Sequence, residues 1–375
     1  MRRGQAFQLV LVGAGHAHLH LIRNAGRLRA AGIRPILVAP SAFHYSGLAT
    51  GVLSGALPVG DNWLDIERLA SARDVEHVPV TAEAIDHAQG RVRLANGAEL
   101  SFDAVSLNVG SVVRDAPQLG NQSGVWKAKP LSELVDLRVH LERHSGAGHA
   151  CASIVVAGGG QSGAEIAAAL AGLCQRIYGQ HDVTLVSPDV SMSWAPVGAA
   201  RSLVAAFRKR GIALIAGHVT GRGDRVCKLD TGAELKCEAL VLATGLDVPP
   251  PASTLAVPHD SRGRIRVTTR LNVAGRPSVF AVGDCATIDE HPRPSLGVFG
   301  VRAAPVLLQN VCALARGEAL AEYLPQTRWL SILDLGDSTG LAIRGKCWSR
   351  GRGALILKRW LDKSFIEKVR STYRG

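Results

Sequence analysis

Two short apolar runs, each followed by closely spaced glycines and then by a helical stretch, organise the first half of the chain. The first run covers residues 7–12, and Gly13 and Gly15 separate it from a helix-compatible stretch. The second covers residues 154–157 and leads through three glycines into an Ala-rich stretch at 164–174, where Ala favours a helix. Each pattern predicts a strand, a glycine turn and a helix, which together open a βαβ unit.

The two units also end in similar segments. RVRLANGAELSFDAVSLNVG closes the first at Gly110, and RVCKLDTGAELKCEALVLATG closes the second at Gly245. NGAEL and TGAEL predict hairpin turns, and in both units the turn glycine lies 13 residues before the closing glycine. A repeat of this extent predicts two related domains.

The remainder of the chain shows three further patterns. A strand-like run at 279–282 leads into Gly283, and we interpret it as the chain returning to complete the first domain. Two strand-like runs precede a final amphipathic helix. The sequence therefore predicts an α/β fold with two Rossmann-like βαβ domains, built of parallel sheets and β-meanders in three layers, plus a small α+β C-terminal region. The expected boundaries are 1–111 and 246–315 for the first domain, 112–245 for the second and 316–375 for the C-terminal region.

Composition agrees with this fold. Of 375 residues, 47% are hydrophobic, and the chain is rich in Gly (41 residues) and poor in aromatic residues (5%), as is typical of α/β domains with tight turns. Its seven Cys include no CxxC pair, so we expect reduced thiols in the cytoplasm rather than disulfides or a zinc site. We expect no segment long enough to span a bilayer.

The formal charge of +12 is concentrated at the C-terminus. Residues 344–375 contain ten Lys or Arg against Asp362 and Glu367, which gives +8 for this segment alone. Leu357, Leu361, Phe365 and Val369 recur every four residues within it, so the sequence predicts a basic amphipathic helix. Two interpretations stay open: residues 355–370 bind an anionic membrane surface, or they pack on the protein itself or in a homodimer. We expect no nucleic-acid binding, because no recognition motif accompanies the basic residues.

A glycine turn between a strand and a helix lets the backbone approach a pyrophosphate, which free N–H groups and the helix dipole stabilise. The second turn matches GxGxxG completely, and the first lacks only its third glycine, which His18 replaces. We expect His18 either to push the helix outward or to turn its ring toward the phosphates. His16 and His20 are interpreted as ordinary residues of the helix start, and no metal site is expected.

Neither unit carries the acidic residue that commonly follows the second strand and binds a ribose. Residues 36–38 lead into Ala39 and Pro40, whereas residues 183–186 lead into Ser187, with Asp189 as the nearest carboxylate. The choice between NADH and NADPH therefore stays open.

Specific motifs show a family resemblance. The two glycine turns, ATG at 243–245 and VFAVGDCA at 279–286 together resemble two-dinucleotide-binding-domain flavoproteins of the pyridine nucleotide-disulfide oxidoreductase superfamily. Within it, the chain is similar to the type II NADH dehydrogenase-like branch. LVGAGHAH at the start, YSGL at 45–48 and LGVFGVRAAPVLLQN at 296–310 resemble FAD-dependent oxidoreductases fused to selenophosphate synthase. The resemblance covers nearly the whole chain.

This resemblance implies FAD on the first domain and NADH or NADPH on the second. Asp284 matches an aspartate that binds the flavin ribityl chain, a role compatible with capping a helix. Ala82 matches a position beside the adenine, and Lys129 one near the flavin. Turns and resemblance together give the expected cofactor-binding residues: Gly13, Ala14, Gly15, His16, Ala17, His18, Pro40, Ala82, Asn108, Gly110, Lys129, Gly283, Asp284, Gly297 and Val298 for FAD, and Gly158, Gly160, Gly163, Ser187 and Gly245 for the nicotinamide nucleotide.

Glu165 is the expected catalytic residue, because it matches a glutamate near both rings that orients the hydride donor or relays a proton. The alternative is a solvated glutamate in the first helical turn. Relatives that reduce disulfides carry a CxxxxC pair near the flavin, but residues 43–47 contain no Cys, which disfavours that chemistry. His44 or Tyr45 is a candidate proton donor there, with core packing as the alternative. Ala303 and Ala304 replace a Gln-Gly pair of the family, so the acceptor stays open.

The expected function is an FAD-dependent NAD(P)H oxidoreductase that passes electrons to a quinone or another small acceptor without a redox-active disulfide. One alternative is a flavin-binding regulatory or interaction protein whose nicotinamide site has decayed, and another is an enzyme similar to sulfide:quinone oxidoreductases. The expected location is the cytoplasm, at the inner face of the membrane if the C-terminal helix binds lipid.

Overall fold

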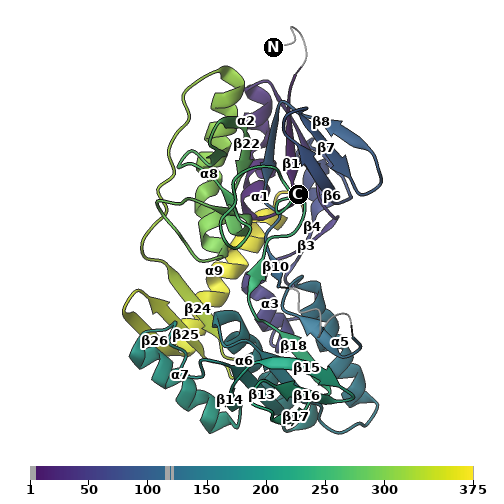
Figure 1. The fold of residues 1–375 in the computed structure, drawn as a ribbon, viewed down its shortest axis with the longest axis vertical. Helices are drawn as coiled ribbons and strands as arrows, with labels where there is room; N and C mark the ends of the chain where they lie inside the picture. The colour runs from purple at the N-terminus through teal and green to yellow at the C-terminus, as the bar shows by residue number, and fades with distance from the viewer. Residues whose placement is uncertain (1–5, 115–118, 120–121, 375) are drawn as a thin grey trace.

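The computed structural model describes residues 6–114, 119 and 122–374. Two α/β units lie one above the other in Figure 1, and the last helix of the chain runs between them. The upper unit contains the N-terminal strands and a long helix from late in the sequence, and the lower unit is formed mainly by the middle of the chain. The α/β class and the parallel sheets confirm the predicted fold class.

The upper unit is built on a sheet of strand order β21-β22-β9-β1-β2-β5. Its strands β1, β2, β5, β9 and β22 run parallel, and β21 is antiparallel to β22. Strands β1 and β9 are buried along nearly their whole length, as expected for parallel strands covered on both faces. The strands are β1 (Phe7–Val12), β2 (Ile33–Val38), β5 (Glu76–Val78), β9 (Ala104–Leu107), β21 (Asn272–Val273) and β22 (Arg276–Ala281).

Helices and a small meander complete the upper unit. Helix α8 packs closely on α1, and the meander covers another side of the sheet. The remaining elements are α1 (His16–Arg23), α2 (Ala25–Ala30), β3 (Ala42–His44), α3 (Ser46–Leu53), β4 (Trp63–Asp65), α4 (Ile66–Ser71), the meander β6 (Ala82–Asp86), β7 (Arg91–Leu94) and β8 (Glu99–Ser101), β20 (Ile265–Arg266), the 3-10 turn η1 (Gly283–Cys285), β23 (Ala286–Thr287) and α8 (Gly297–Arg316).

The lower unit repeats this plan with strand order β11-β18-β12-β13-β14, all parallel. A short antiparallel pair of β10 and β19 lies where the chain passes between the units. The elements are β10 (Val112–Val113), β11 (Val125–Lys127), α5 (Ser132–Gly146), β12 (Ser153–Ala157), α6 (Gln161–Tyr178), β13 (Asp182–Ser187), α7 (Val197–Arg210), β14 (Ala213–Ala216), the meander β15 (Val219–Gly223), β16 (Val226–Leu229) and β17 (Glu234–Lys236), β18 (Ala239–Leu242) and β19 (Leu246–Asp247). Both predicted hairpins, β7–β8 and β16–β17, are confirmed.

The C-terminal segment binds the two units together. Strands β24 (Leu330–Asp334), β25 (Gly340–Arg344) and β26 (Cys347–Gly351) form an antiparallel sheet, and α9 (Arg352–Arg370) follows. Leu333 and Leu341 join the hydrophobic core of the lower unit, whereas Ile366 and Val369 of α9 join that of the upper unit. Strand β26 was not predicted, because the charged and polar residues around it resemble a loop.

Helix α8 contradicts the expectation that no segment of the chain is long enough to span a bilayer. By length and composition alone, its 20 residues would suffice to cross a membrane, although no such segment was expected. Just over half of the tested segment is buried, at 56%, and its inward face belongs to the core against α1. Burial inside a folded domain therefore explains its apolar sequence.

Candidate functional site

The first glycine turn closes tightly against the end of β9. A Cβ added to Gly13 would lie 2.6 Å from the backbone oxygen of Asn108, and one added to Gly15 would lie 2.3 Å from Asn108 Oδ1. Oδ1 of Asn108 accepts a hydrogen bond from Ala17 N (3.0 Å), and Asn108 Nδ2 donates to the carbonyl of Val282 (2.8 Å). One amide side chain thus joins the start of α1, β9 and the end of β22.

His18 fills the position of the missing third glycine by turning inward. Its Nδ1 hydrogen bonds with the carbonyl of Gly13, and its Nε2 lies 2.8 Å from Ser106 Oγ on β9. The ring is completely buried, and burial lowers its pKa to about 4. The expectation that the ring faces bound phosphates is therefore wrong, and only the backbone N–H of His18 lies at the helix start, 3.4 Å from Asn108 Oδ1.

The second glycine turn has the closer strand-helix contact. A Cβ on Gly163 would lie 1.7 Å from the carbonyl oxygen of Gly158, and one on Gly158 would lie 2.3 Å from that of Ala243. Around Gly160, the residue that precedes α6, a Cβ would meet nothing within 4 Å. The turn therefore leaves open space at the positive end of the α6 dipole, where a pyrophosphate fits.

The position after β13 at which a ribose-binding residue is expected has a partly exposed carboxylate, Asp189, beside the buried Ser187. Ser187 is buried, and its Oγ accepts a hydrogen bond from the backbone N–H of Asp189 (3.2 Å). The carboxylate of Asp189 accepts hydrogen bonds from the backbone and hydroxyl groups of Ser191 and Ser193, and these bonds hold its pKa below the usual range. Asp189 is thus an ionised, internally satisfied carboxylate next to Ser187.

Asp284 and Lys129 come from distant parts of the sequence and form an ion pair of 2.9 Å. Ser111 Oγ donates to the same carboxylate oxygen (2.7 Å) and accepts from Lys129 Nζ (2.7 Å). Burial acts to raise the pKa of Asp284, but Lys129 and Ser111 outweigh it and lower the pKa overall. An ionised carboxylate of this kind can accept hydrogen bonds from sugar hydroxyls.

His16 begins α1 and lies within a group of aromatic rings. Its ring centroid is 5.7 Å from that of Phe43, 5.5 Å from Tyr45 and 5.4 Å from Phe365 on α9. A Cβ on Gly297, the first residue of α8, would lie 3.3 Å from His16 Cε1. Burial lowers the pKa of His16 to about 4, so the ring is neutral at pH 7. The starts of α1 and α8 therefore converge on one apolar surface.

Glu165 lies just past the first turn of α6, and its side chain is largely buried. Its Oε1 accepts hydrogen bonds from Thr50 Oγ1 and from the backbone N–H of Asp334, each 2.8 Å, and lies 3.8 Å from Lys358 Nζ on α9. Burial raises the pKa of Glu165, while Lys358 and both hydrogen bonds oppose the rise. The interpretation of Glu165 as an exposed first-turn residue is therefore wrong.

The other predicted positions lie around the two turns. Gly110 and Gly245 have positive φ angles of 74° and 118°, which glycine adopts readily, and they follow the equivalent strands β9 and β18. Ala82 is buried at the start of β6, and Pro40 is exposed after β2. Ala14 belongs to the first turn, and Val298 follows Gly297 in α8. Their contacts with a cofactor stay predictions.

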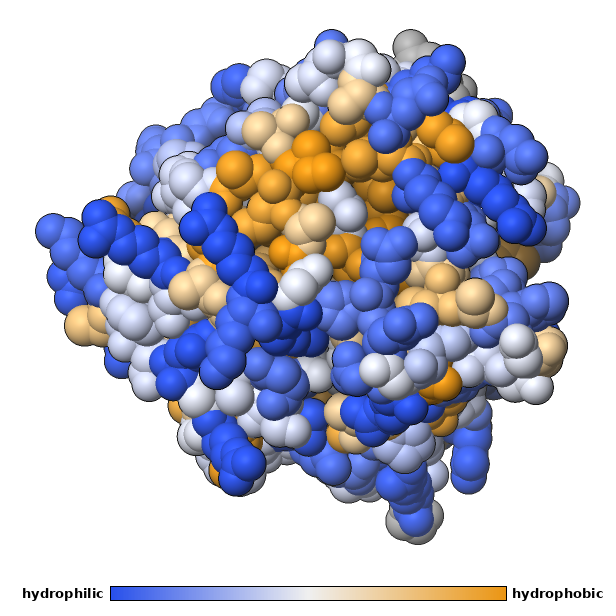
Figure 2. Space-filling view, turned by 90° about the horizontal axis from the view of Figure 1, so that it is seen from below, coloured by the Kyte–Doolittle hydropathy of each residue, from blue (hydrophilic) through white to orange (hydrophobic). Residues whose placement is uncertain are grey.

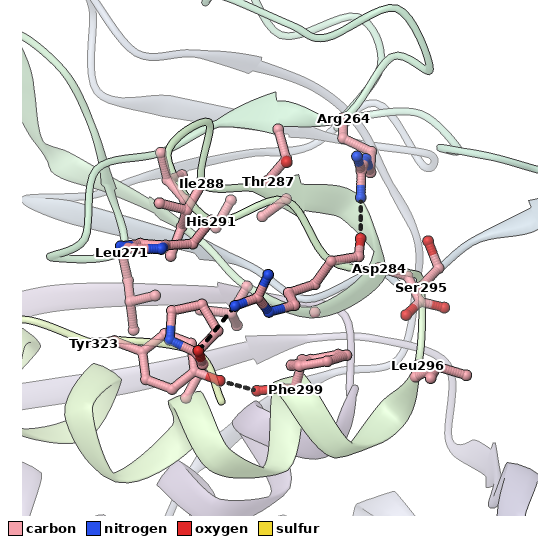
Figure 3. A pocket seen from close by; sticks show the side chains of 18 of the residues that line it. Arg264, Leu271, Asp284, Thr287, Ile288, His291, Ser295, Leu296, Phe299 and Tyr323 are labelled. Atoms are coloured by element: carbon pink, nitrogen blue, oxygen red, sulfur yellow. Dashed lines mark hydrogen bonds between the residues drawn. The ribbon is translucent and has the colours of Figure 1, made fainter. Parts of the chain in front are cut away.

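A pocket adjoins Asp284 on the side of α8 (Figure 3). Its labelled residues include Leu271, Ile288 and Phe299 as apolar walls, with His291 and Arg264 among the polar ones. Tyr323 donates a hydrogen bond to the carbonyl of Phe299 across one side (3.4 Å). Ala303, one of the two adjacent alanines of α8, also lines this pocket.

Sequence reasoning missed Lys358, Thr50 and Asp362. Lys358 and Asp362 were recognisable as charges one helical turn apart, on the face that also carries Leu355, Ile366 and Val369.

The predicted apolar stripe of α9 was wrong in part. Leu357 and Leu361 are 40% and 42% exposed, and they form a second, outward face with Ile356 and Trp360. Figure 2 shows one broad hydrophobic area on an otherwise mainly hydrophilic face of the molecule.

The cysteines and the acidic and histidine side chains of the described part of the chain form neither a disulfide nor a metal-binding cluster. All seven Cys are free thiols, and Cys285, next to Asp284, is completely buried, which raises its pKa to about 11. Within residues 6–114, 119 and 122–374, no group of three or more His, Cys, Asp and Glu side chains is arranged to hold a metal.

The residues present fit two dinucleotides. The open space at Gly160 suits a phosphate, and the paired Asp284 and Lys129 suit a ribityl chain with its adjoining phosphate. The aromatic and glycine surface around His16 and Gly297 suits a flat ring system. Lys358 links Glu165 of the second turn's helix to Asp362, and Asp362 accepts a hydrogen bond from Tyr45, whose ring contacts His16 of the first turn.

Comparisons with known proteins agree with this geometry. An NADH dehydrogenase-like protein of Mycobacterium tuberculosis is 27% identical over 310 residues, which cover 76% of this chain and 74% of the relative. Ferroptosis suppressor protein 1 of Xenopus tropicalis is 25% identical over 387 residues, covering 96% of each chain. The structure of NDH2 from Plasmodium falciparum in complex with NADH has a TM-score of 0.82 at 11% identity and covers 97% of both chains.

A second solved structure, the sulfide:quinone oxidoreductase of Aquifex aeolicus, has a TM-score of 0.80 at 17% identity and covers 98% of this chain and 92% of its own. These likenesses confirm the two-dinucleotide-domain fold. The sequence profile of the pyridine nucleotide-disulphide oxidoreductases matches residues 7–304, most of the chain. The protein therefore belongs to the pyridine nucleotide-disulphide oxidoreductase family, as its motifs predicted.

Proposed function

We propose that this protein is an FAD-dependent NAD(P)H oxidoreductase of the NADH dehydrogenase-like kind. The observation that carries the proposal is the largely buried pair of Glu165 and Lys358. Glu165 belongs to the helix of the second glycine turn, and Lys358 is connected through Asp362 and Tyr45 to His16 at the first. A bound flavin supplies the hydride chemistry, and the protein supplies binding, orientation and electrostatics. The names of the relatives and of the NDH2 structure support this class.

The roles of the residues follow from their contacts. Gly158, Gly160 and the start of α6 bind the nicotinamide dinucleotide, while Gly13, Gly15 and the start of α1 bind the flavin dinucleotide. Asp284 accepts hydrogen bonds from the ribityl hydroxyls, and Lys129 keeps its carboxylate ionised. Glu165 orients the nicotinamide ring, because Thr50 and Asp334 N hold its carboxylate in one place.

NADH is the proposed donor in preference to NADPH. The ionised carboxylate of Asp189 follows the strand end at Ser187, where it opposes a 2′-phosphate. The loop 188–196, PDVSMSWAP, offers no Lys or Arg to bind such a phosphate. Steady-state rates with both nucleotides test this point, and equal kcat/KM values would contradict it.

A quinone is the proposed acceptor, and the inner membrane surface the proposed place of action. Relatives named for NADH dehydrogenase and a structural neighbour named for quinone chemistry support this choice. The outward face of α9, with Ile356, Leu357, Trp360 and Leu361, together with the basic residues of the helix suits an anionic lipid surface. Co-sedimentation with vesicles of anionic or neutral lipid tests whether this face binds an anionic membrane.

The close relation to oxidoreductases fused to selenophosphate synthase stays a prediction.

The alternatives have weaker support. An enzyme similar to sulfide:quinone oxidoreductases needs reactive sulfur near the flavin, but the thiol of Cys285 is buried and its pKa is raised. A regulatory protein with a decayed nicotinamide site is disfavoured, because the second turn retains all three glycines and a buried Glu165.

Anaerobic titration of the FAD-loaded protein tests the function. NADH should bleach the flavin absorbance within seconds, and a panel of quinones should restore it under anaerobic conditions. A polypeptide that refuses FAD, or a bound flavin that neither NADH nor NADPH bleaches, would contradict the proposal. Glu165→Gln should slow the bleaching about 10- to 100-fold, since it removes the carboxylate from the site.

A further inference from the structure

Asp362 of α9 is the centre of a largely buried network that reaches Glu165. Its Oδ2 accepts a hydrogen bond from Lys358 Nζ (3.1 Å), and its Oδ1 accepts one from the hydroxyl of Tyr45 (2.9 Å). Lys358 Nζ also donates to the carbonyl of Gly47 (2.8 Å) and lies 3.8 Å from Glu165. The side chains of Lys358, Asp362 and Glu165 are 13%, 14% and 17% exposed, so these charges interact with little solvent screening.

The backbone is shaped for this contact. A Cβ on Gly47 would lie 2.2 Å from Asp362 Oδ1 and 2.6 Å from Tyr45 Cε1. Any larger residue at position 47 would push the carboxylate away from the tyrosine hydroxyl. The absence of a side chain therefore lets α9 approach the start of α3 closely enough to form the network.

The network also reaches the flavin side of the site. Tyr45 stacks on Phe365 of α9 with ring centroids 4.8 Å apart, and both rings contact His16 at the start of α1. Asp362 thus lies between the aromatic group of the first turn and the glutamate of the second. Its carboxylate is the nearer of the two acidic partners of Lys358.

We propose that Asp362 is a positioning residue that directs the Lys358 ammonium at Glu165, and that the Tyr45 hydroxyl holds Asp362 in that position. The inference rests on the proposed function, because it assigns the two residues to the place where the cofactor rings meet. Glu165 at 3.8 Å is too distant to hold the ammonium by a hydrogen bond, so Asp362 and Gly47 determine its direction.

The charges around Lys358 explain why it stays protonated. Burial acts to lower the pKa of Lys358, but Glu165, Asp362 and Asp334 together raise it above its ordinary value. The groups that face it come from every neighbouring element: Glu165 of α6, Asp334 of β24, Asp362 and Arg359 of α9, and Tyr45 before α3. Replacing Asp362 by Asn removes one of these charges and keeps the size of the side chain.

The test compares FAD-loaded wild type with Asp362→Asn from pH 7 to pH 11. The raised pKa of Lys358 gives wild type stability that is lost as the pH rises from ~10, and the variant, whose Lys358 has a lower pKa, has less of this stability to lose. The variant should melt about 5 °C below wild type at pH 7, and this difference should shrink as the pH rises. Flavin reduction by NADH should be about tenfold slower at pH 7, with a pH profile displaced from that of wild type.

Glu367→Gln is the matched control, because it makes the same change on the same helix at a side chain that is 53% exposed. This variant should melt at the wild-type temperature at each pH, and its flavin reduction should keep the wild-type pH profile. A melting difference for Asp362→Asn that stays constant with pH, together with an unshifted rate profile, would overturn the proposal.

Tyr45→Phe gives an independent variant that keeps every charge. It should displace the pH profile in the same direction and slow flavin reduction about threefold at pH 7, since one hydrogen bond is lost. If Asp362→Asn fails to fold, a wild-type profile in Tyr45→Phe sinks the inference. Wild-type protein that NADH does not bleach would instead refute the proposed function, and the melting curves would still test the network.

Discussion

The two glycine turns of this protein solve the same problem differently. In the second, Gly163 brings α6 so close to β12 that no Cβ fits, whereas in the first His18 occupies the same position and turns its ring beneath α1. The second turn packs closely because Gly163 has no side chain, whereas the first is held by the hydrogen bonds of the His18 ring with Gly13 and Ser106. A departure from GxGxxG therefore indicates a different support for the turn and is no sign that the turn is lost.

Gly163→Ala should have the largest effect, because its Cβ would lie 1.7 Å from the carbonyl oxygen of Gly158. We expect a loss of about 3 kcal/mol in the free energy of unfolding and a rise of more than about tenfold in KM for NADH. Urea unfolding and steady-state kinetics measure these effects. Gly26→Ala is the control: a Cβ there meets nothing within 4 Å, so stability should be unchanged or slightly higher.

His18→Gln tests the support of the first turn through its pH dependence. The folded protein keeps His18 neutral down to about pH 4, whereas the unfolded chain protonates it below about pH 6.5. Acidification over this range therefore favours unfolding of wild type, and stability falls. The variant should lose about 2 kcal/mol at pH 7 and approach wild type near pH 4.

Thermal unfolding from pH 4 to pH 8 measures this convergence. His20→Gln on the same helix should converge less, because burial lowers the pKa of this partly buried ring less strongly than that of His18. Parallel stability curves for His18→Gln and wild type would show that His18 does not titrate as its burial requires. His18→Gly should not restore stability either, because Ser106 would lose its partner.

Asn108→Asp should have a smaller effect confined to the first turn. The substitution keeps an acceptor for Ala17 N but replaces the donor to the carbonyl of Val282 with a second oxygen. We expect a loss of about 1–2 kcal/mol and faster release of FAD, with NADH affinity unchanged. Flavin fluorescence follows the release, and a change limited to NADH binding would contradict the assignment of this amide to the flavin side.

Gly160→Ala should leave folding intact, because a Cβ there meets nothing within 4 Å. The methyl group instead enters the space assigned to the pyrophosphate, so KM for NADH should rise about threefold to tenfold. An unchanged melting temperature together with an unchanged KM would place the pyrophosphate elsewhere.

The sequence predicted the elements that local patterns determine. Both glycine turns, the two hairpins and the return of the chain at β22 lie where the periodicity and the repeat placed them. The turns and hairpins depend on residues within about thirty positions of one another, the length of a βαβ unit, whereas β22 pairs Val279 with Val105 of β9 across 174 positions. The acceptor, the cofactor contacts and the domain boundaries stay predictions.

The sequence could not predict contacts between distant segments. Glu165 and Lys358 are 193 positions apart, and Tyr45 and Asp362 are 317 apart, so no periodicity relates them. Asp284 and Lys129 were both recognised, but their ion pair depends on two separate loops meeting. For α9, the four-residue spacing identified a helix yet mixed its two sides: Leu357 and Leu361 face outward, whereas Val369 is buried. The buried side escaped recognition because Lys358 and Asp362 make it partly polar.

Helix α9 couples the two units mechanically. Ile366 and Val369 belong to the core of the upper unit, whereas Lys358 pairs with Glu165 of the lower one. A local disturbance of α9 therefore removes apolar contacts from one unit and an ion pair from the other. The two units should accordingly unfold in one cooperative transition and not one after the other.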